Sequence, residues 1–374
     1  MELESKNKSN LKNEMLATGM QRFEVVDLFC GVGGLTCGMQ QAGFNVVAGF
    51  DNDETCEYAY SHNNHAKFNC RNIRNVSAKE IIDCYSVGSN KILVGCAPCQ
   101  PFSTMSYKRF KNTPRELDEK YDLLAEFGRL VKEVKPTIVS MENVPEIRNS
   151  NVFKSFVNLL IECGYFTDNG QIVYCPDYGI PQNRHRFVLL ASLLGEIHLL
   201  QPTHKRKEVC VRPYIENLPP VKAGEICETD PLHRTAKLSD INLRRIRASS
   251  PGGTWKDWPE ELRCECHKKD SGQTYTSVYG RMSWDKIGPT ITTQFFCYGT
   301  GRYGHPEQDR ALTLREGALL QTFPEKYEFF PPETKDICMR DIARHIGNAV
   351  PVRLGEIIGN SIIKHLEKYK KEVR

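Results

Sequence analysis

A cysteine between two prolines is the first residue whose setting suggests chemistry. Cys99 lies in the segment GCAPCQPFS (residues 95–103), directly after an apolar run that predicts a strand. In an open α/β sheet, ligands bind beyond the carboxyl ends of the strands, so a cysteine at this position can act as a nucleophile. Pro98 and Pro101 stiffen the backbone on either side of Cys99, which suits a group that must be aimed.

The same cysteine belongs to a Cys96-x-x-Cys99 pair, for which a redox pair and half of a metal site are the alternatives. Redox use would favour a thioredoxin-sized fold, and a chain of 374 residues is far larger. A zinc site would need a second ligand pair, and Cys264-x-Cys266-His267 has poor spacing for one. We therefore expect no metal, and we interpret the 15 cysteines as thiols in a reducing compartment.

Three charged residues fall beside other predicted strands. Glu142, in the segment SMENVP, ends an apolar run and would emerge on the same rim of the sheet as the cysteine. Arg184 and Arg186, in QNRHRF (residues 182–187), would point to one side of an extended chain. The structural alternatives are a carboxylate that caps the following helix and arginines that form surface salt bridges.

A glycine-rich segment, DLFCGVGG (residues 27–34), joins a predicted strand to a predicted helix. Glycine allows a ligand to approach the backbone closely, and the N-terminus of the helix offers free N–H groups. The dinucleotide pattern G-x-G-x-x-G does not fit, because Thr36 stands at its third glycine position. Asp51, at the end of the next strand, stands where a carboxylate binds ribose hydroxyls. The loop predicts a ligand that contains a nucleoside, and a tight turn is the alternative.

The elements that must position these residues alternate between strand and helix, which predicts an α/β sheet wound from βα units up to about residue 195. Strands are predicted over residues 22–29, 46–50, 91–95, 137–141, 172–175 and 187–191, and helices over 35–41, 121–134, 152–163, 314–321 and 352–370. Residues 201–281 are rich in Pro, Gly, Arg and Cys, which indicates a small domain or an elaborate insertion. Residues 1–21 predict a flexible tail.

Composition narrows the class of protein. Hydrophobic residues at 40% and charged residues at 26% are ordinary globular usage, which argues against a disordered or fibrous chain. The net charge of +4 excludes DNA wrapping driven by bulk charge, although it leaves room for a local basic cleft. The chain has neither an apolar run of membrane-spanning length nor an apolar leader, so we expect a cytoplasmic protein that does not contact a membrane.

Taken together, the motifs resemble those of the DNA (cytosine-5)-methyltransferases that use S-adenosylmethionine. The resemblance rests on DLFCGVGG (27–34), GCAPCQPFS (95–103), MENV (141–144), QNRHRF (182–187) and IGNAVP (346–351), in the family's order. The segment HPEQDRALTLREGALLQTFP (305–324) resembles the block before the last motif, and the match spans about residues 22–360.

The resemblance implies an α/β fold, with a Rossmann-like methyltransferase large domain and a small target-recognition domain inserted into it. After the tail at 1–21, the large domain would occupy 22–195 and 286–374, and the target-recognition domain would occupy 196–285.

The family's mechanism assigns four catalytic roles. By resemblance, Cys99 is the thiolate that adds to carbon 6 of cytosine, and Glu142 provides the proton at nitrogen 3. Arg184 matches the arginine that contacts the base oxygen, and Arg186 matches the arginine that supports the carboxylate. The sequence names no convincing side chain that would remove the proton from carbon 5.

The resemblance also assigns the residues that bind S-adenosylmethionine. They are Phe29 beside the adenine and sulfonium, Gly31, Gly33 and Gly34 around the methionine part, Asp51 on the ribose, and Leu123 and Asn348 as further contacts. Asn72 departs from the family, because many members have an aspartate there that binds the adenine amino group. We expect Asn72 to accept one hydrogen bond through its carbonyl oxygen, with some loss of charge complementarity.

The expected substrate is double-stranded DNA, and the target base must leave the helix to reach the cysteine. Basic residues in the loop 104–115 are expected to contact phosphates, and those in 196–285 to contact phosphates or guanine. The residues are Lys108, Arg109, Lys111 and Arg115 in the loop, and Arg244 and Arg245 in the second region. We expect a bacterial-type monomer, associated with the nucleoid when bound to DNA. It is either the partner of a restriction endonuclease or a solitary enzyme.

Three other functions compete with this interpretation. A NAD-dependent oxidoreductase would have a glycine at position 36 and no use for the cysteine, glutamate and arginines. A catalytically silent DNA-binding relative would be expected to lack Cys99 or Glu142, and both are present. An RNA-directed relative shares the chemistry, but the size of the region 196–285 favours sequence-specific duplex DNA.

Overall fold

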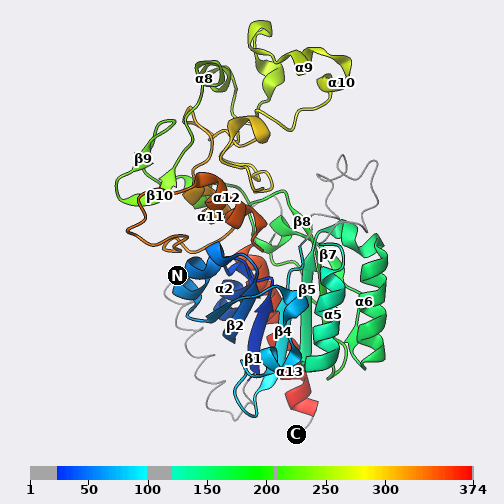
Figure 1. Ribbon diagram of the computed structural model, residues 1–374. Coiled ribbons are helices and arrows are strands. Elements are labelled where there is room, and N and C mark those ends of the chain that lie inside the picture. Colours follow the sequence, from blue (N-terminus) through cyan, green and yellow to red (C-terminus); the bar gives the residue numbers. More distant parts are fainter. Residues whose placement is uncertain (1–22, 99–119, 205–208, 373–374) are drawn as a thin grey trace. The chain divides into compact units, whose positions relative to one another are not determined.

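The computed structural model describes residues 23–98, 120–204 and 209–372, and it separates into two compact units (Figure 1). The first unit comprises Met1–Val173, His185–Gln201 and Leu354–Arg374, and the second comprises Tyr174–Arg184 and Pro202–Arg353. Residues 286–353 therefore pack with 202–285, whereas the sequence placed them with the large domain. The assignment of 196–285 to target recognition stays a prediction.

An eight-stranded sheet forms the centre of the first unit, with the order β3-β2-β1-β4-β5-β8-β6 and with β7 paired to β8. Its strands are β1 (Phe23–Leu28), β2 (Asn45–Asp51), β3 (Lys67–Cys70), β4 (Asn90–Gly95), β5 (Ile138–Asn143), β6 (Phe166–Thr167), β7 (Gln171–Tyr174) and β8 (His185–Ser192). Strands β1 to β5 pair in parallel, while β8 runs antiparallel to β5 and β6 runs antiparallel to β8. The parallel sheet expected from the βαβ pattern thus extends only as far as β5.

Helices cover both faces of this sheet, which explains why the central strands β1 and β5 are buried along nearly their whole length. They are α2 (Gly34–Gln41), α3 (Glu57–Asn64), α4 (Ala78–Ile82), α5 (Leu123–Val134), α6 (Asn151–Glu162) and α13 (Val352–Glu372). Helices α4, α5 and α6 share one apolar core with the strands. Helix α13 packs against α2 so closely that a β-carbon on Gly355 would lie 2.9 Å from the Leu35 carbonyl oxygen.

The second unit has little regular structure. Its elements are α7 (Arg212–Ile215), β9 (Ile226–Cys227), β10 (Asp230–Arg234), α8 (Asp240–Arg247), α9 (Glu265–Lys268), α10 (Asp270–Gln273), α11 (Leu314–Leu320) and α12 (Met339–Asn348). Part of its apolar core gathers around Trp255 and Trp258, each only 2% exposed. Both tryptophans are therefore packing residues. None of the helices in the described ranges is long and apolar enough to cross a membrane.

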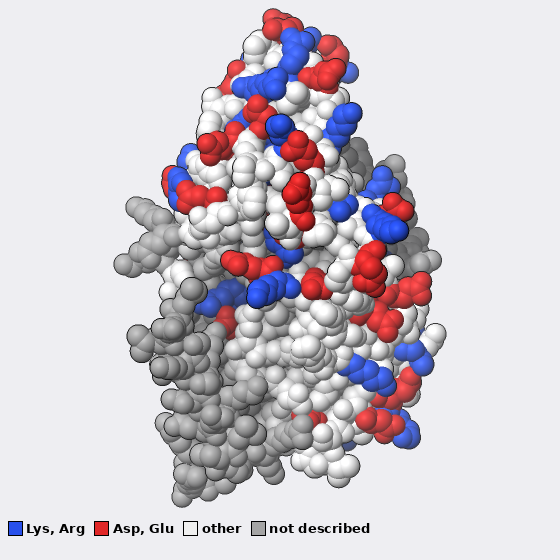
Figure 2. Space-filling view, turned by 90° about the vertical axis from the view of Figure 1, so that its left-hand side faces the viewer, with Lys and Arg blue, Asp and Glu red and all other residues white. Residues whose placement is uncertain are grey.

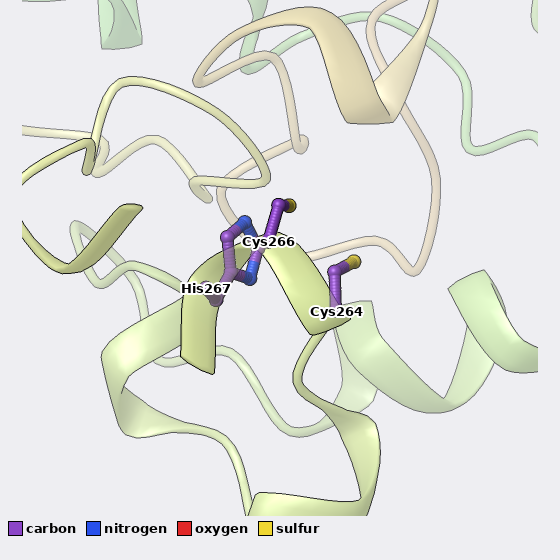
Figure 3. Close-up of side chains that lie close together, drawn as sticks. All are labelled: Cys264, Cys266 and His267. Atoms are coloured by element: carbon purple, nitrogen blue, oxygen red, sulfur yellow. The ribbon is translucent and has the colours of Figure 1, made fainter. Parts of the chain in front are cut away.

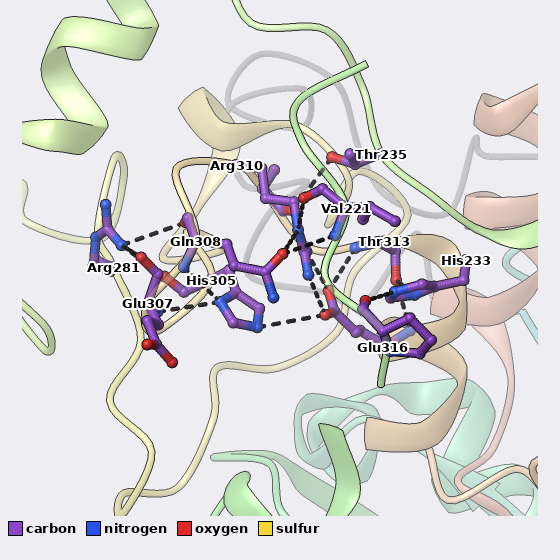
Figure 4. A network of polar contacts seen from close by, with 12 residues as sticks. Val221, His233, Thr235, Arg281, His305, Glu307, Gln308, Arg310, Thr313 and Glu316 are labelled. Carbon is purple, nitrogen blue, oxygen red and sulfur yellow. Dashed lines mark hydrogen bonds and ion pairs between the residues drawn. The ribbon is translucent and has the colours of Figure 1, made fainter. Parts of the chain in front are cut away.

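A buried polar network links distant segments of the second unit (Figure 4). Arg310 donates two hydrogen bonds to Glu316, at 2.8 and 2.7 Å, and the Thr313 amide donates a third at 2.8 Å. Burial raises the pKa of Glu316, but the charge and hydrogen bonds of Arg310 outweigh burial and lower it to about 2. His305 lies 3.6 Å from the same carboxylate, and burial lowers the pKa of His305 to about 4. At neutral pH, Arg310 and Glu316 therefore form an ion pair beside an uncharged His305.

Candidate active site

The loop between β1 and α2 carries four of the predicted cofactor residues. Phe29, Gly31 and Gly33 adopt φ values of 60°, 49° and 86°, in the left-handed region, and Gly34 begins α2. A β-carbon built on Gly31 would meet no atom within 4 Å, so the space beside this residue is open. Gly31 therefore presents accessible backbone beyond the carboxyl end of β1, where a ligand can approach, whereas Gly33 and Gly34 are buried.

Asp51 lies at the end of β2 and is hydrogen-bonded to this loop. Its Oδ2 accepts a hydrogen bond from the Gly31 amide at 2.8 Å, and its Oδ1 accepts one from the Asp53 amide at 3.0 Å. Burial raises the pKa of Asp51, and these backbone hydrogen bonds oppose the increase. A carboxylate has about four acceptor positions, so both oxygens can still accept a hydroxyl group of a ligand.

A second carboxylate, which the sequence analysis did not select, lies under the same loop. Asp27 is 1% exposed, and its Oδ2 accepts a hydrogen bond from Thr36 Oγ1 at 2.7 Å. Its Oδ1 has no hydrogen-bond partner within the described ranges. Burial raises the pKa of Asp27 to about 7, and the charge of Asp51 adds to the increase. Two carboxylates that repel each other beside an open loop favour a ligand that carries positive charge.

The other predicted cofactor residues lie on separate elements. Asn72 is exposed at the start of a 3-10 helix, Ile73–Asn75, and its Oδ1 accepts a hydrogen bond from the Arg74 amide at 3.1 Å. Leu123 begins α5 and packs half-buried against the core of the first unit. Asn348, the last residue of α12, is exposed in the second unit.

Glu142 forms a buried ion pair with Arg186 in the first unit. Glu142 is in β5 and 2% exposed, and Arg186 is in the adjacent strand β8. The Nε atom of Arg186 lies 2.9 Å from Glu142 Oε1, yet Oε1 takes part in no hydrogen bond among the described residues. The contact is thus electrostatic, and Oε1 keeps its capacity to bind another hydrogen-bonding group. The alternative in which Glu142 caps a helix is not what the structure shows.

The segment that leads to the predicted nucleophile is attached to β5. Cys96 Sγ donates a hydrogen bond to Glu142 Oε2 at 2.7 Å. Asn143 Nδ2 donates one to the Ala97 carbonyl oxygen at 2.9 Å. Sequence reasoning treated Cys96 only as a redox or metal alternative, and it did not select Asn143, although Asn143 lies within the motif MENV. Cys99 itself lies outside the described residues, as do Lys108, Arg109, Lys111 and Arg115.

Arg184 belongs to the second unit and is anchored within it. It is 3% exposed, and its guanidinium donates to the carbonyl oxygens of Ile291 at 3.0 Å and Ala349 at 3.4 Å. The bond to Ala349 connects the motif QNRHRF to the segment IGNAVP, which is far away in the sequence. The predicted contact between Arg184 and the base stays a prediction.

The two arginines predicted to contact DNA differ in their surroundings on α8. Arg244 is exposed. Arg245 is half-buried, donates to the Leu262 carbonyl oxygen at 2.8 Å, and lies over the Trp258 ring at 5.4 Å from its centre. On the face shown in Figure 2, basic and acidic side chains are interspersed. Because Arg244 is exposed and Arg245 is half-buried, Arg244 is better placed to contact phosphate.

Comparison with known proteins gives a consistent result along nearly the whole chain. The family model for C-5 cytosine-specific DNA methylases matches residues 23–364. The Type II methylase M.HgiDII of Herpetosiphon aurantiacus is 52% identical over 347 residues, which cover 92% of this chain and 96% of the relative. The Type II methyltransferase M.PspPI of Psychrobacter sp. is 29% identical, with 96% of this chain and 83% of the relative covered.

Solved structures agree in fold. A protein described as a DNA modification methyltransferase encoded within an E. coli prophage superimposes with a TM-score of 0.69 at 21% identity, over 92% of this chain and 99% of the other. The methyltransferase EhMeth of Entamoeba histolytica has a TM-score of 0.62 at 18% identity, over 93% and 99%. The Rossmann-like methyltransferase fold expected from the sequence is confirmed. The chain belongs to the C-5 cytosine-specific DNA methylases and is a DNA (cytosine-5)-methyltransferase, of a family whose methyl donor is S-adenosylmethionine.

Proposed function

We propose that the enzyme methylates carbon 5 of a cytosine within a specific double-stranded DNA sequence, through a covalent bond between Cys99 and carbon 6 of a flipped-out base. The proposal rests on the family match over residues 23–364, within which the motifs stand in the family's order. Flipping is required because a protein thiol cannot reach carbon 6 inside a stacked duplex.

The covalent step makes carbon 5 nucleophilic. The Cys99 thiolate adds to carbon 6, and the displaced electron pair is received at nitrogen 3, where the Glu142 carboxyl group donates a proton. Carbon 5 then takes the methyl group of the donor, whose methyl–sulfur bond breaks so that the electron pair stays on sulfur and a neutral thioether leaves. Loss of the carbon 5 proton to a base returns an electron pair to the ring, expels the thiolate and restores the double bond, while nitrogen 3 gives its proton back.

The surroundings of Glu142 support its role in that step. Oε2 is occupied by the Cys96 thiol, whereas Oε1 makes no hydrogen bond and lies next to the Arg186 charge. Oε1 is therefore the oxygen that would meet nitrogen 3. Glu142 would supply the proton to nitrogen 3 as the base binds and excludes water from the site.

The glycine loop and its two carboxylates suit S-adenosylmethionine, which supplies an electrophilic methyl group and carries positive charge on its sulfonium and ammonium groups. Asp51 would accept hydrogen bonds from the ribose hydroxyls, and Asp27 would stabilise the positive charge. Phe29, Gly31, Gly33, Gly34 and Leu123, which belong to the same unit, would complete this part of the binding site. Asn72 Oδ1 accepts from the Arg74 amide and has a second lone pair for the adenine amino group.

Duplex DNA would be bound by the loop 104–115 and by the region 196–285, which we propose as the target-recognition domain. Exposed Arg244 supports this role for the region. The words "Type II" in the relatives' names support a restriction-modification context, with a restriction endonuclease as the partner. We propose that the enzyme acts as a monomer.

The decisive test is substitution of the nucleophile. Cys99→Ala and Cys99→Ser are expected to abolish methyl transfer, measured with tritiated S-adenosylmethionine on DNA from cells that lack cytosine methylation. DNA that carries 5-fluorocytosine at the target should form a covalent adduct with the wild-type enzyme, because fluorine blocks the elimination. Near-normal turnover by Cys99→Ser, or the absence of an adduct on a mapped target, would disprove the Cys99 route.

A further inference from the structure

A cluster of metal-binding side chains lies in the second unit, in a segment that the methylation chemistry does not use. One ligand atom each from Cys264, Cys266 and His267 lie within 4.8 Å of one another (Figure 3). The spacing of these residues looked poor in the sequence. The structure nevertheless brings the three side chains together. Cys264 has an extended backbone, at φ −70° and ψ 151°, and directly precedes the single turn of α9, which carries Cys266 and His267.

His267 is held in place by aromatic rings. It is 4% exposed, and its ring stacks on Trp255 at 4.2 Å between ring centres, with Tyr279 against its edge at 5.9 Å. Its Nδ1 is buried and has no hydrogen-bond partner among the described residues. A buried polar atom without a partner is destabilising, and an imidazole nitrogen can gain a partner by binding a metal ion.

Two arginines lie near the cluster, so the net charge of a complete site matters. Arg245 and Arg263 both act electrostatically on His267. Arg245 donates to the Leu262 carbonyl oxygen at 2.8 Å and to Asn242 Oδ1 at 3.0 Å, and both of these acceptors are uncharged. A divalent cation with two thiolates and a neutral imidazole sums to zero charge, so the arginines do not oppose the complete site.

We propose that Cys264, Cys266 and His267 bind one Zn²⁺ ion, with water as the fourth ligand. Two sulfurs and one imidazole nitrogen are the donors that zinc prefers, and each thiol releases its proton on binding. Cys266 is exposed and Cys264 half-buried, so the ion and its water can enter from solvent. The ion would fix α9 against Trp255 and Tyr279 in a segment with little regular structure.

The zinc content of the full-length, reduced protein tests the proposal. After reconstitution with Zn²⁺ alone and desalting, elemental mass spectrometry should find about one zinc ion per chain in the wild type. Cys264→Ser and Cys266→Ser should each lose most of it. Cys338→Ser is the matched control, because Cys338 is an exposed cysteine of the same unit outside the cluster, and it should keep its zinc. A wild type without zinc, or equal zinc in all four proteins, overturns the proposal.

Cobalt replacement reports on the ligands directly. Co²⁺ bound by thiolates gives near-ultraviolet charge-transfer absorption, which should fall by about half in either cluster variant if each sulfur is a ligand. Circular dichroism must show that Cys266→Ser remains folded, as its exposure leads us to expect. An unchanged cobalt spectrum in a folded Cys266→Ser protein would also disprove the site.

Discussion

Two buried glutamates in this enzyme differ in how completely they are bonded. Glu316, in the second unit, accepts two hydrogen bonds from Arg310 and one from the Thr313 amide. Glu142, in the first unit, accepts one hydrogen bond from Cys96, and its other oxygen has an arginine nearby but no hydrogen bond among the described residues. Both are at most 2% exposed, so burial does not distinguish them.

The difference separates a structural carboxylate from a reactive one. The Glu316 carboxylate joins segments of the chain. Both of its oxygens are hydrogen-bonded within the protein, so neither is available to a ligand. The Glu142 carboxylate is held in place by one oxygen while the other remains available for a ligand. Proton transfer to a base requires this arrangement. The same contrast holds for Asp27, whose Oδ1 has no partner within the described ranges.

The largest effect is expected from Glu142→Gln. The amide has nearly the shape of the acid but cannot transfer its proton, so kcat should fall by about 10²–10⁴ while KM for DNA stays near the wild-type value. Single-turnover methylation of a duplex substrate measures the loss. Glu162→Gln, at an exposed position of α6, is the matched control and should be fully active. A Glu142→Gln enzyme with wild-type kcat would remove Glu142 from the mechanism.

Glu316→Gln should act on stability instead. It leaves the buried Arg310 charge without its counter-ion, which typically costs about 3–5 kcal/mol. Urea unfolding measures the change, with exposed Glu325→Gln as the control. The pKa of Glu316 is lowered from 4.5 to about 2. The contribution of Glu316 to the free energy of unfolding is therefore present above pH 4.5 and is lost as the pH falls toward 2. A variant that retained the wild-type acid transition would contradict the assignment.

The sequence predicted the first unit well because its signals are local. The β-branched run of β1, the glycines after it and the apolar run of β4 each depend on neighbouring residues. Arg186 was expected to support Glu142, and its Nε atom lies 2.9 Å from Glu142 Oε1, while the catalytic roles of both residues stay predictions. The reversed direction of β8 was not predicted, because strand direction depends on how residues 144–184 return to the sheet. That path is not encoded in any local pattern.

The second unit was less predictable, because long-range polar contacts hold it together. Arg310, for example, donates to the Val221 carbonyl oxygen, 89 residues away, at 3.0 Å. Such contacts bring 286–353 into the unit of 202–285, and no local pattern of glycines or apolar residues marks them. Helix α12 was not predicted either. The motif IGNAVP was recognised, but the helix that ends within this motif, at Asn348, was not.

Asp27→Asn should change the pH dependence of stability. Burial raises the pKa of Asp27 from 3.8 to about 7. The stabilisation of the folded state that follows from this raised pKa is fully present below pH 3.8 and is lost as the pH rises to 7. Asparagine does not titrate. The free energy of unfolding of the variant, relative to that of the wild type, should therefore be higher at pH 8 than at pH 5. Urea unfolding without cofactor at both pH values measures this. Parallel pH profiles for the two proteins would show that Asp27 has an ordinary pKa.

The smallest effect is expected from Cys96→Ala, which removes the only hydrogen bond that Glu142 accepts from a described residue, that from Cys96 Sγ at 2.7 Å. Cys96 would be a positioning residue, and one hydrogen bond contributes about 0.5–1.5 kcal/mol, so kcat should fall by at most about tenfold. Cys96→Ser keeps a donor and should recover most of the activity. A structural role alone would lower the thermal stability of both variants equally and leave the pH dependence of kcat unchanged. A shift of that profile in Cys96→Ala, restored by serine, would show that the thiol tunes the proton on Glu142.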